Sequence, residues 1–537
     1  MPEFVLPDYS SEVQPAFTDR AACAAWLAEL PLVNVAPAQL RLLEQLHALN
    51  RHVLAPEERL QILEAMRESV CFVQSEQIKK LASKPLPLTS VENGVFRSVD
   101  ALWQELLLGY KRCLVATTEG KLKQQIATLG ARGLDCVASN MFDHCSVHRD
   151  FPAAYWLDLH QFYLAAEAAG ESVTAVADAA RPGDACCAEI YVRALLFALA
   201  DTGEQSQRQR TQIQRWLGNW AQHVPVRRTP PAEAGLPPLL IDYATPSGAF
   251  RETAAKGRST RAYLDLGELA RILKKHVVLL RKGETPASLG LGEDCAMPGV
   301  EQLLVLLFRL WCEGKNARTQ TRRSVNAGAK VCGTMVNMHF HVSGNKTFRQ
   351  PGHATQLSRR ERDEIATFGH TSTRLEDARV EAGSYATEDW LLEEESLSGL
   401  RILRPAATTG ARYLQMQLLA VKPADAKQFL VGMVRWLKTD EENNLHVGMR
   451  VFPGMPQAVA IRATGINATK EQFVPALYCP AFAALSVPAS LIVPPGWYRP
   501  KRVLEVYRQS SELLMLSALL DRGVDFERVA IEAPEKE

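Results

Sequence analysis

The sequence Arg318-Thr319-Gln320-Thr321-Arg322 stands directly before residues 325–342, the first segment of this 537-residue chain whose composition is typical of a β-strand. Upstream of it, apolar residues recur every three to four positions, which indicates helices. Downstream of it, short runs of β-branched and aromatic residues alternate with turn residues, which indicates strands. The chain is therefore predicted to change from a helical to a β-rich region after Gly314, with two arginines near the junction.

The helical region is predicted to form antiparallel helix pairs, and both a bundle and a divergent helical solenoid fit the pattern. Leucines recur at helical spacing from Leu40 to Leu49, and Pro56 marks the start of the next helix. Segments containing Gly and Pro, such as 181–184, separate the helices. The predicted helices are residues 40–49, 57–81, 101–115, 122–141, 152–169, 186–200 and 204–222.

Residues 224–238 are basic and rich in proline, so they are predicted to form a connector at a domain boundary. Two more helices, 266–280 and 300–313, are predicted after it. We therefore expect residues 1–223 to be a helical domain and residues 224–314 to be a connector with two further helices.

The β-rich region is predicted to contain two groups of strands, which makes the fold class α+β multidomain. The first group lies in residues 315–465, and its clearest hairpin joins residues 429–437 to residues 445–452. The second group, residues 466–537, forms a smaller β domain in which Pro488 would confine one strand to a sheet edge. Residues 344–389 are polar and predict a long insertion. The predicted strands are 331–342, 399–403, 413–421, 429–437, 445–451 and 458–462, then 474–478, 485–493, 502–507, 512–519 and 526–531.

Composition limits the kinds of function. With 61 basic and 60 acidic residues, the chain lacks the broad basic field that drives non-specific nucleic-acid or membrane-surface binding, so any anion site is local. No apolar run is long enough to span a membrane. Eleven cysteines without a C-x-x-C pair and the absence of an apolar leader favour a reducing cytoplasm.

The arginines Arg318 and Arg322 are the first candidate binding residues. A guanidinium is a planar, permanently charged fork that can grip a phosphate, or the acceptor edge of guanine, through two hydrogen bonds at once. The sequence therefore favours a guanine nucleotide rich in phosphate as the ligand.

The order of elements resembles the PilZ family of cyclic di-GMP receptors: an R-x-x-x-R segment, a strand, a [D/N]-x-S-x-x-G motif, then barrel hairpins. The family's arginines fall on Arg318 and Arg322, and its serine and glycine fall on Ser396 and Gly399. The resemblance implies a PilZ-like β-barrel that binds cyclic di-GMP with these residues, together with the neighbouring Arg323. It extends more loosely to long proteobacterial proteins that pair a helical region with such a barrel.

Glu394 stands where the PilZ motif has Asp or Asn. An unpaired carboxylate beside a dianionic ligand would repel it. If the site binds nucleotide, we therefore expect Glu394 to turn away from the phosphate or to pair with a cation such as Arg323.

Other motifs give weaker evidence for a function. The sequence His148-Arg149-Asp150 resembles a kinase catalytic loop, but the Asn expected five residues after the Asp is absent. His339 and His341 would share one face of the strand 331–342, where a polar strand face is favoured over a metal site. The sequence thus predicts a cytoplasmic, non-catalytic effector with no metal or cofactor, in which cyclic di-GMP acts as regulatory ligand and the helical half binds a protein partner. The alternatives are a scaffold of motility or envelope machinery that no longer binds nucleotide, and an enzyme whose site the sequence does not reveal.

Overall fold

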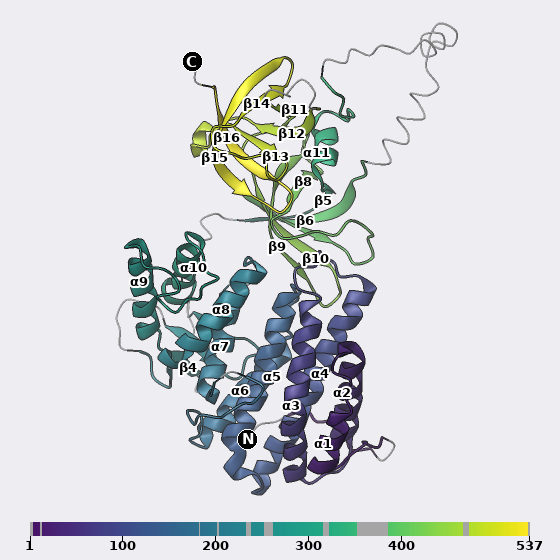
Figure 1. Ribbon diagram of the computed structural model, residues 1–537, viewed down its shortest axis with the longest axis vertical. Helices are drawn as coiled ribbons and strands as arrows, with labels where there is room; N and C mark the ends of the chain where they lie inside the picture. Colours follow the sequence, from purple (N-terminus) through teal and green to yellow (C-terminus); the bar gives the residue numbers. More distant parts are fainter. Residues whose placement is uncertain are drawn as a thin grey trace, which may run out of the picture. The chain divides into compact units, whose positions relative to one another are not determined.

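A computed structural model describes residues 4–10, 13–181, 183–200, 203–231, 238–251, 261–314, 322–351, 385–464 and 472–534. The chain divides into two compact units. The first comprises Met1–Lys84 and Leu88–Arg318, and the second comprises Pro85–Pro87 and Thr319–Glu537 (Figure 1). Among the described residues, no helix combines the length and the apolar character needed to cross a membrane.

The first unit is mainly helical, as predicted. Its longest helices, α3, α4 and α5, lie side by side, and α2 packs against α3 and α4 (Figure 1). The helices are α1 (Arg20–Ala28), α2 (Val35–Arg51), α3 (Pro56–Lys79), α4 (Ser90–Ala116), α5 (Ile126–Ser146), α6 (Ala153–Ala168), α7 (Cys187–Leu199), α8 (Gln207–Trp220), α9 (Gly267–Arg281) and α10 (Gly299–Phe308), the last followed by a π-helical turn (Arg309–Glu313).

Local sequence explains where several of these helices begin. Helix α3 starts with Pro56, whose missing N–H group would have no partner at that position. Helix α4 starts after Thr89, which forms a capping box with Glu92: the Glu92 N–H donates to the Thr89 hydroxyl at 3.2 Å, and the Thr89 N–H donates to the Glu92 carboxylate at 2.8 Å. Ser206 and Gln209 cap α8 in the same way.

Within the predicted connector, residues Val226–Arg227 belong to a small sheet, and residues 232–237 lie outside the described part of the chain. The strands of this sheet are β1 (Val226–Arg227), β2 (Leu239–Asp242), β3 (Phe250–Arg251) and β4 (Arg261–Leu264), in the order β1-β4-β2-β3. The ring of Tyr243, just after β2, stacks on Tyr191 of α7, and the Trp311 indole N–H donates to the Leu196 carbonyl at 2.9 Å. One hydrophobic core runs from Phe17 to Cys312. Residues 224–314 therefore share a core with the helices, and an independent domain ending at residue 223 stays a prediction.

The second unit consists of two closed, six-stranded antiparallel barrels. The fold class predicted from the sequence, a helical region followed by a barrel and a second β domain, is confirmed. The first barrel contains β5 (Arg323–Cys332), β6 (Glu388–Ser396), β7 (Gly399–Arg404), β8 (Leu418–Pro423), β9 (Leu430–Thr439) and β10 (Leu445–Val451), and the second contains β11 (Gln457–Ala463), β12 (Val474–Cys479), β13 (Ser490–Val493), β14 (Val503–Tyr507), β15 (Ser511–Arg522) and β16 (Glu527–Glu532).

The predicted strand 331–342 is wrong over most of its length. Strand β5 ends at Cys332, and residues Met335–Val342 form helix α11. Thr334, two residues after the end of β5, caps the helix, because its hydroxyl accepts the Asn337 N–H at 3.4 Å. Met335, Met338 and Val342, three to four residues apart, all pack into the core that the two barrels share. The apolar residues thus follow a helical period, which a segment of eight residues is too short to reveal.

The structure also corrects two predictions about single residues, the histidine pair and Pro488. His339 and His341 lie on α11, where residues two apart point to different sides of the helix, so they do not share a strand face. Pro488 precedes β13, which has β12 and β16 on its two sides in a closed barrel, so this strand is not at an edge. Most of the predicted insertion at 344–389 lies outside the described residues.

The two barrels are joined by apolar and polar contacts. Helix α11 packs against β11 and β12, although it follows a strand of the first barrel. Arg450 of β10 forms an ion pair with Asp521 of β15, and Arg528 of β16 contacts the same carboxylate at 3.2 Å. The short segment Pro85–Pro87 also belongs to this unit: the Leu86 N–H donates to the Tyr413 carbonyl at 2.8 Å, and the Arg412 guanidinium donates to the Pro85 carbonyl at 2.6 Å.

Candidate ligand site on the first barrel

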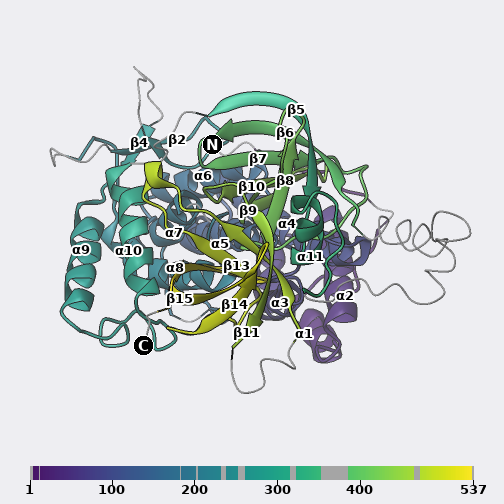
Figure 2. The same ribbon diagram turned by 90° about the horizontal axis from the view of Figure 1, so that it is seen from above.

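Strands β5, β6 and β7 are adjacent in the first barrel and bring together residues far apart in the sequence (Figure 2). Arg322 directly precedes β5, Arg323 is opposite Glu395 on β6, and Ser396 is opposite Gly399 on β7. The predicted site residues Arg322, Arg323, Ser396 and Gly399 therefore gather around one hairpin. Arg318 lies outside the described residues.

A side-chain hydrogen bond from Ser396 closes the hairpin between β6 and β7. The Ser396 hydroxyl donates to the Gly399 carbonyl at 3.1 Å, and the Val451 N–H donates to the Ser398 carbonyl at 3.0 Å. A Cβ atom on Gly399 would lie only 3.0 Å from the Met449 carbonyl oxygen of β10, the neighbouring strand. Glycine therefore allows β7 and β10 to approach closely at this end of the barrel.

Glu394, which stands where the PilZ motif has Asp or Asn, forms an ion pair with Arg322, one of the arginines predicted to bind the ligand. Arg322 Nη1 lies 2.9 Å from Glu394 Oε2, and Arg401 Nη1 lies 3.5 Å from Glu394 Oε1. Arg323, the partner expected from the sequence, pairs with Glu395 at 2.7 Å. Glu394 thus pairs with neighbouring cations, but not with Arg323, the example given from the sequence, because Glu394 is opposite Ser324 in the strand pairing and Glu395 is opposite Arg323.

Bulges in β5 and β6 shape this arrangement. The pairing of β5 with β6 shifts between Ser324 and Ala327, where Asn326 adopts a positive φ of 51°. The pairing of β6 with β7 shifts between Leu392 and Glu394, so Arg401 reaches two consecutive carboxylates: its Nε atom lies 2.8 Å from Glu393 Oε2. These irregularities follow from tertiary packing and have no clear signal in the sequence.

The ion pairs of this cluster are open to solvent. Side-chain exposure is 39% for Arg322, 32% for Glu394, 35% for Arg401 and 70% for Arg323. Solvent screens such pairs, so each adds at most about 1 kcal/mol to the free energy of unfolding. The guanidinium groups are therefore held loosely enough to exchange one anion for another.

Two members of the cluster, Arg401 and His446, were not predicted from the sequence. Arg401 follows Gly399 by two residues, so both belong to the same face of β7, and this spacing was a usable signal. His446 on β10 bridges two acids, with Nδ1 3.3 Å from Glu393 and Nε2 3.0 Å from Asp440. No local pattern in the sequence marks these two partners.

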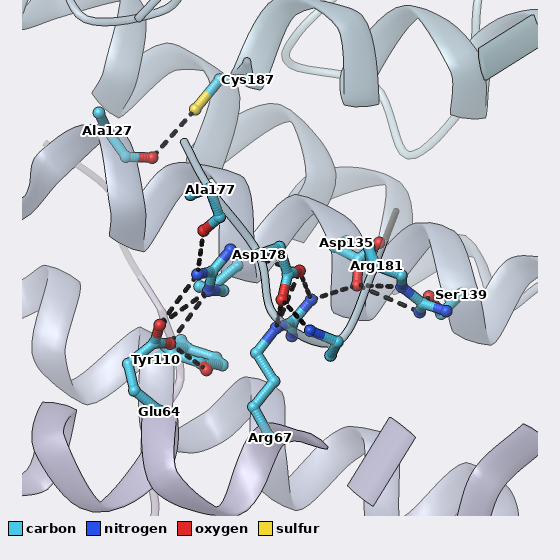
Figure 3. Close-up of polar contacts among 12 residues, drawn as sticks. Glu64, Arg67, Tyr110, Ala127, Asp135, Ser139, Ala177, Asp178, Arg181 and Cys187 are labelled. Atoms are coloured by element: carbon cyan, nitrogen blue, oxygen red, sulfur yellow. Dashed lines mark hydrogen bonds and ion pairs between the residues drawn. The ribbon is translucent and has the colours of Figure 1, made fainter. Parts of the chain in front are cut away.

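A second charged cluster lies inside the first unit (Figure 3). Arg67 of α3 contacts Asp135 of α5 at 2.6 Å and Asp178 at 2.7 Å. Arg132 contacts Asp178 at 3.4 Å, and Arg181 contacts Asp135 at 3.2 Å. Glu64 completes the network: it accepts from Arg132 at 2.9 Å and from the Tyr110 hydroxyl at 2.8 Å.

This network fixes the segment between α6 and α7. Asp178 and Arg181 come from that segment, which the sequence analysis treated as a simple break between helices. Burial alone would raise the pKa of the Asp178 carboxyl, but its hydrogen bond with Arg67 and the charges of Arg67 and Arg132 lower the pKa below its ordinary value. The carboxylates are already bound by arginines of the protein, so the cluster serves the fold.

No metal centre is found in the described part of the chain, where His, Cys, Asp and Glu nowhere gather in a group of three that could hold an ion. Burial raises the pKa of the Cys187 thiol to about 12, and its S–H donates to the Ala127 carbonyl at 3.5 Å (Figure 3). Such a thiol packs as a small apolar side chain.

Two protein-family models match the chain. The N-terminal domain of the cyclic-di-GMP receptor FimW matches residues 21–231, and the FimW C-terminal β-barrel domain matches residues 459–534, which hold nearly all of the second barrel. In these two regions the chain is similar to FimW. FimW of Pseudomonas aeruginosa, a cyclic-di-GMP receptor, is 23% identical over 515 residues, which cover 87% of this chain and 83% of FimW. The first barrel lies between the two matched ranges.

Proposed function

We propose that this FimW-like chain is a receptor for cyclic di-GMP, and that its ligand site is the end of the first barrel where Arg322 meets the hairpin between β6 and β7. The observation that carries the proposal is the convergence of Arg322 with Glu394, Ser396 and Gly399, although 72 residues separate Arg322 from Glu394. Since FimW is named as a cyclic-di-GMP receptor, the relationship supports the same ligand class.

The chemistry of the site suits this ligand. Arg318, Arg322 and Arg323 would supply guanidinium forks for the phosphates and for the O6 and N7 acceptors of guanine. Gly399 lacks a side chain that would fill the surface between β7 and β10, and Ser396 offers a hydroxyl beside it. In this proposal the barrel is PilZ-like, and it carries no catalytic groups.

The proposed output is a change in protein contacts. Arg322 directly precedes β5, and the π-helical turn at Arg309–Glu313 is the last described helical element of the first unit. A ligand that holds Arg322 and Arg323 favours one conformational state of the protein, which would alter how the helical half presents itself to a protein partner. A ligand shifts such an equilibrium only by its difference in affinity for the two states.

A specific observation favours a second candidate function. Glu394 already binds Arg322, so the site contains its own anion. A barrel in which this pair never opens would be a scaffold that no longer binds nucleotide.

Calorimetric titration of the full chain with cyclic di-GMP, GTP and cyclic di-AMP separates the two. The receptor is expected to bind cyclic di-GMP in preference to the other two, because adenine lacks the adjacent O6 and N7 acceptors of guanine. Equal binding of all three nucleotides, or no heat from any of them, contradicts the receptor and supports the scaffold.

A further inference from the structure

The carboxylate of Glu394 lies between two guanidinium groups that come from different places in the chain. Arg322 reaches one oxygen from the start of β5, at 2.9 Å, and Arg401 reaches the other oxygen from β7, at 3.5 Å. Glu394 itself stands on β6, the strand between them. One anionic group thus bridges two arginines, which is the arrangement that two oxygens of a phosphate would also adopt.

Arg401 has the exposure and the position of a ligand residue. Its side chain is 35% exposed, and it follows Gly399 on the accessible face of β7, where Leu400 and Ile402 point into the barrel. Its position is fixed by strand pairing, because Arg401 is directly opposite Glu394. A side chain presented from a paired strand is better ordered than one presented from a loop.

The arginines around Glu394 are matched by carboxylates without a ligand. Among the described residues of β5, β6 and β7 and the residue before β5, Arg322, Arg323 and Arg401 pair with Glu393, Glu394 and Glu395. A dianionic nucleotide added to this set would meet uncompensated carboxylates, which repel it. Binding therefore requires one carboxylate to leave, and Glu394 is the one that touches both Arg322 and Arg401.

On the basis of the proposed function, we propose that Arg401 is a further ligand-binding arginine, and that a ligand phosphate takes the place of the Glu394 carboxylate between Arg322 and Arg401. In the ligand-free protein Glu394 acts as an internal competitor. The site then binds more weakly than its arginines would allow, and it does not collect other anions in the absence of the nucleotide.

A double-mutant cycle of Arg401→Ala and Glu394→Gln tests this role, with cyclic di-GMP binding measured by calorimetry. Arg401→Ala is expected to weaken binding by about tenfold or more, the effect of one charge-assisted hydrogen bond. Glu394→Gln, which removes the competing charge at nearly constant shape, is expected to tighten binding. The double mutant is expected to bind about tenfold more weakly than Glu394→Gln alone.

The cycle distinguishes a ligand contact from a positioning role. If Arg401 served only to hold Glu394, its removal would have no effect once Glu394 is neutral, so equal affinities of Glu394→Gln and the double mutant would overturn the inference. Arg401→Lys keeps the charge without the planar fork and is expected to fall between wild type and Arg401→Ala.

A matched control lies in the second barrel. Arg462 of β11 is opposite Glu505 of β14 and pairs with it at 2.6 Å, so Arg462→Ala removes a similar cross-strand ion pair away from the site. Its cyclic di-GMP affinity is expected to equal that of wild type. If wild type binds and Arg322→Ala does not, while Arg401→Ala binds normally, only the role of Arg401 fails. If wild type does not bind, the proposed function fails with it.

Discussion

The two arginine-carboxylate clusters of this protein use the same residue types but differ in burial. In the first unit, the side chain of Arg67 is 3% exposed and its partners Asp135 and Asp178 are 13% and 11% exposed. On the first barrel, Arg322 and Glu394 are 39% and 32% exposed. Breaking a buried pair leaves a charge without water, whereas an exposed pair exchanges its partners with solvent and with other ions. Burial thus makes the first cluster part of the fold and leaves the second available for a ligand.

The strongest test of this difference is Asp178→Ala. The substitution leaves the three arginines of the network with only two carboxylates, Asp135 and Glu64, and we expect it to lower the free energy of unfolding by about 3 to 5 kcal/mol. Chemical denaturation followed by circular dichroism at 222 nm reports on the helices. Glu268→Ala, which removes an exposed pair with Arg271 on α9, is the matched control and should change stability by less than about 1 kcal/mol. Equal effects of the two substitutions would show that burial does not separate the clusters.

The second test concerns Asp143, a partly buried acid whose carboxylate accepts a hydrogen bond from a neutral donor. Burial raises the pKa of Asp143 to about 7, although the Trp103 indole N–H donates to its carboxylate at 2.7 Å. A raised pKa means that ionisation opposes folding, so this residue destabilises the protein increasingly as pH rises from about 4 to about 7. Asp143→Asn removes that penalty while keeping an acceptor for Trp103.

The expected result depends on pH. At pH 8, Asp143→Asn should raise the free energy of unfolding by up to about 4 kcal/mol, and at pH 4 the two proteins should be nearly equal. Asp178 has the opposite sign: its lowered pKa stabilises the protein above the unfolded value near 4, and this contribution is lost as pH falls further. Asp143→Asn that stabilises equally at both pH values would show that the effect does not come from ionisation.

Long helices could be predicted from the sequence, and a short helix could not. Helices such as α3 and α4 were readable because their apolar residues recur over many turns and their starts carry Pro56 and Thr89. Helix α11 could not be predicted in this way, because it has only eight residues and follows closely after strand β5. Short apolar runs do not distinguish the two periods.

The candidate site was predictable only in part. Arg322, Ser396 and Gly399 carried the resemblance, and the structure places them around one hairpin. The contact of Glu394 with Arg322 and Arg401 depends on strand register and on bulges in β5 and β6, which a single sequence does not reveal. Asp178 was missed for a similar reason, because nothing local marks a loop acid that inserts among buried arginines.

For the exposed cluster we expect the opposite result: a substitution should change ligand binding and leave stability nearly unchanged. Arg322→Ala should leave the thermal unfolding midpoint nearly unchanged, yet it should weaken cyclic di-GMP binding by about 1.5 to 3 kcal/mol, the contribution of hydrogen bonds to a charged group. Calorimetry measures the binding, and circular dichroism checks the fold. A variant that binds as wild type does would remove Arg322 from the site, and one that unfolds would place this pair with the buried cluster.

The smallest expected effect belongs to Glu394→Asn, which restores the amide found in the PilZ motif. Asparagine is shorter and neutral, so it releases Arg322 and Arg401 and no longer repels a phosphate. Because the pair it breaks is exposed, the gain in binding should be about 1 kcal/mol or less, with no loss of stability. Titration of both proteins with cyclic di-GMP gives four distinguishable outcomes. Tighter binding by the variant supports displacement of the carboxylate, and equal binding contradicts it. Binding by wild type but not by the variant would make Glu394 itself a ligand contact, accepting from guanine N–H groups, and would overturn the competitor role. If neither protein binds cyclic di-GMP, restoring the amide does not restore a site, and the first barrel would then be a scaffold.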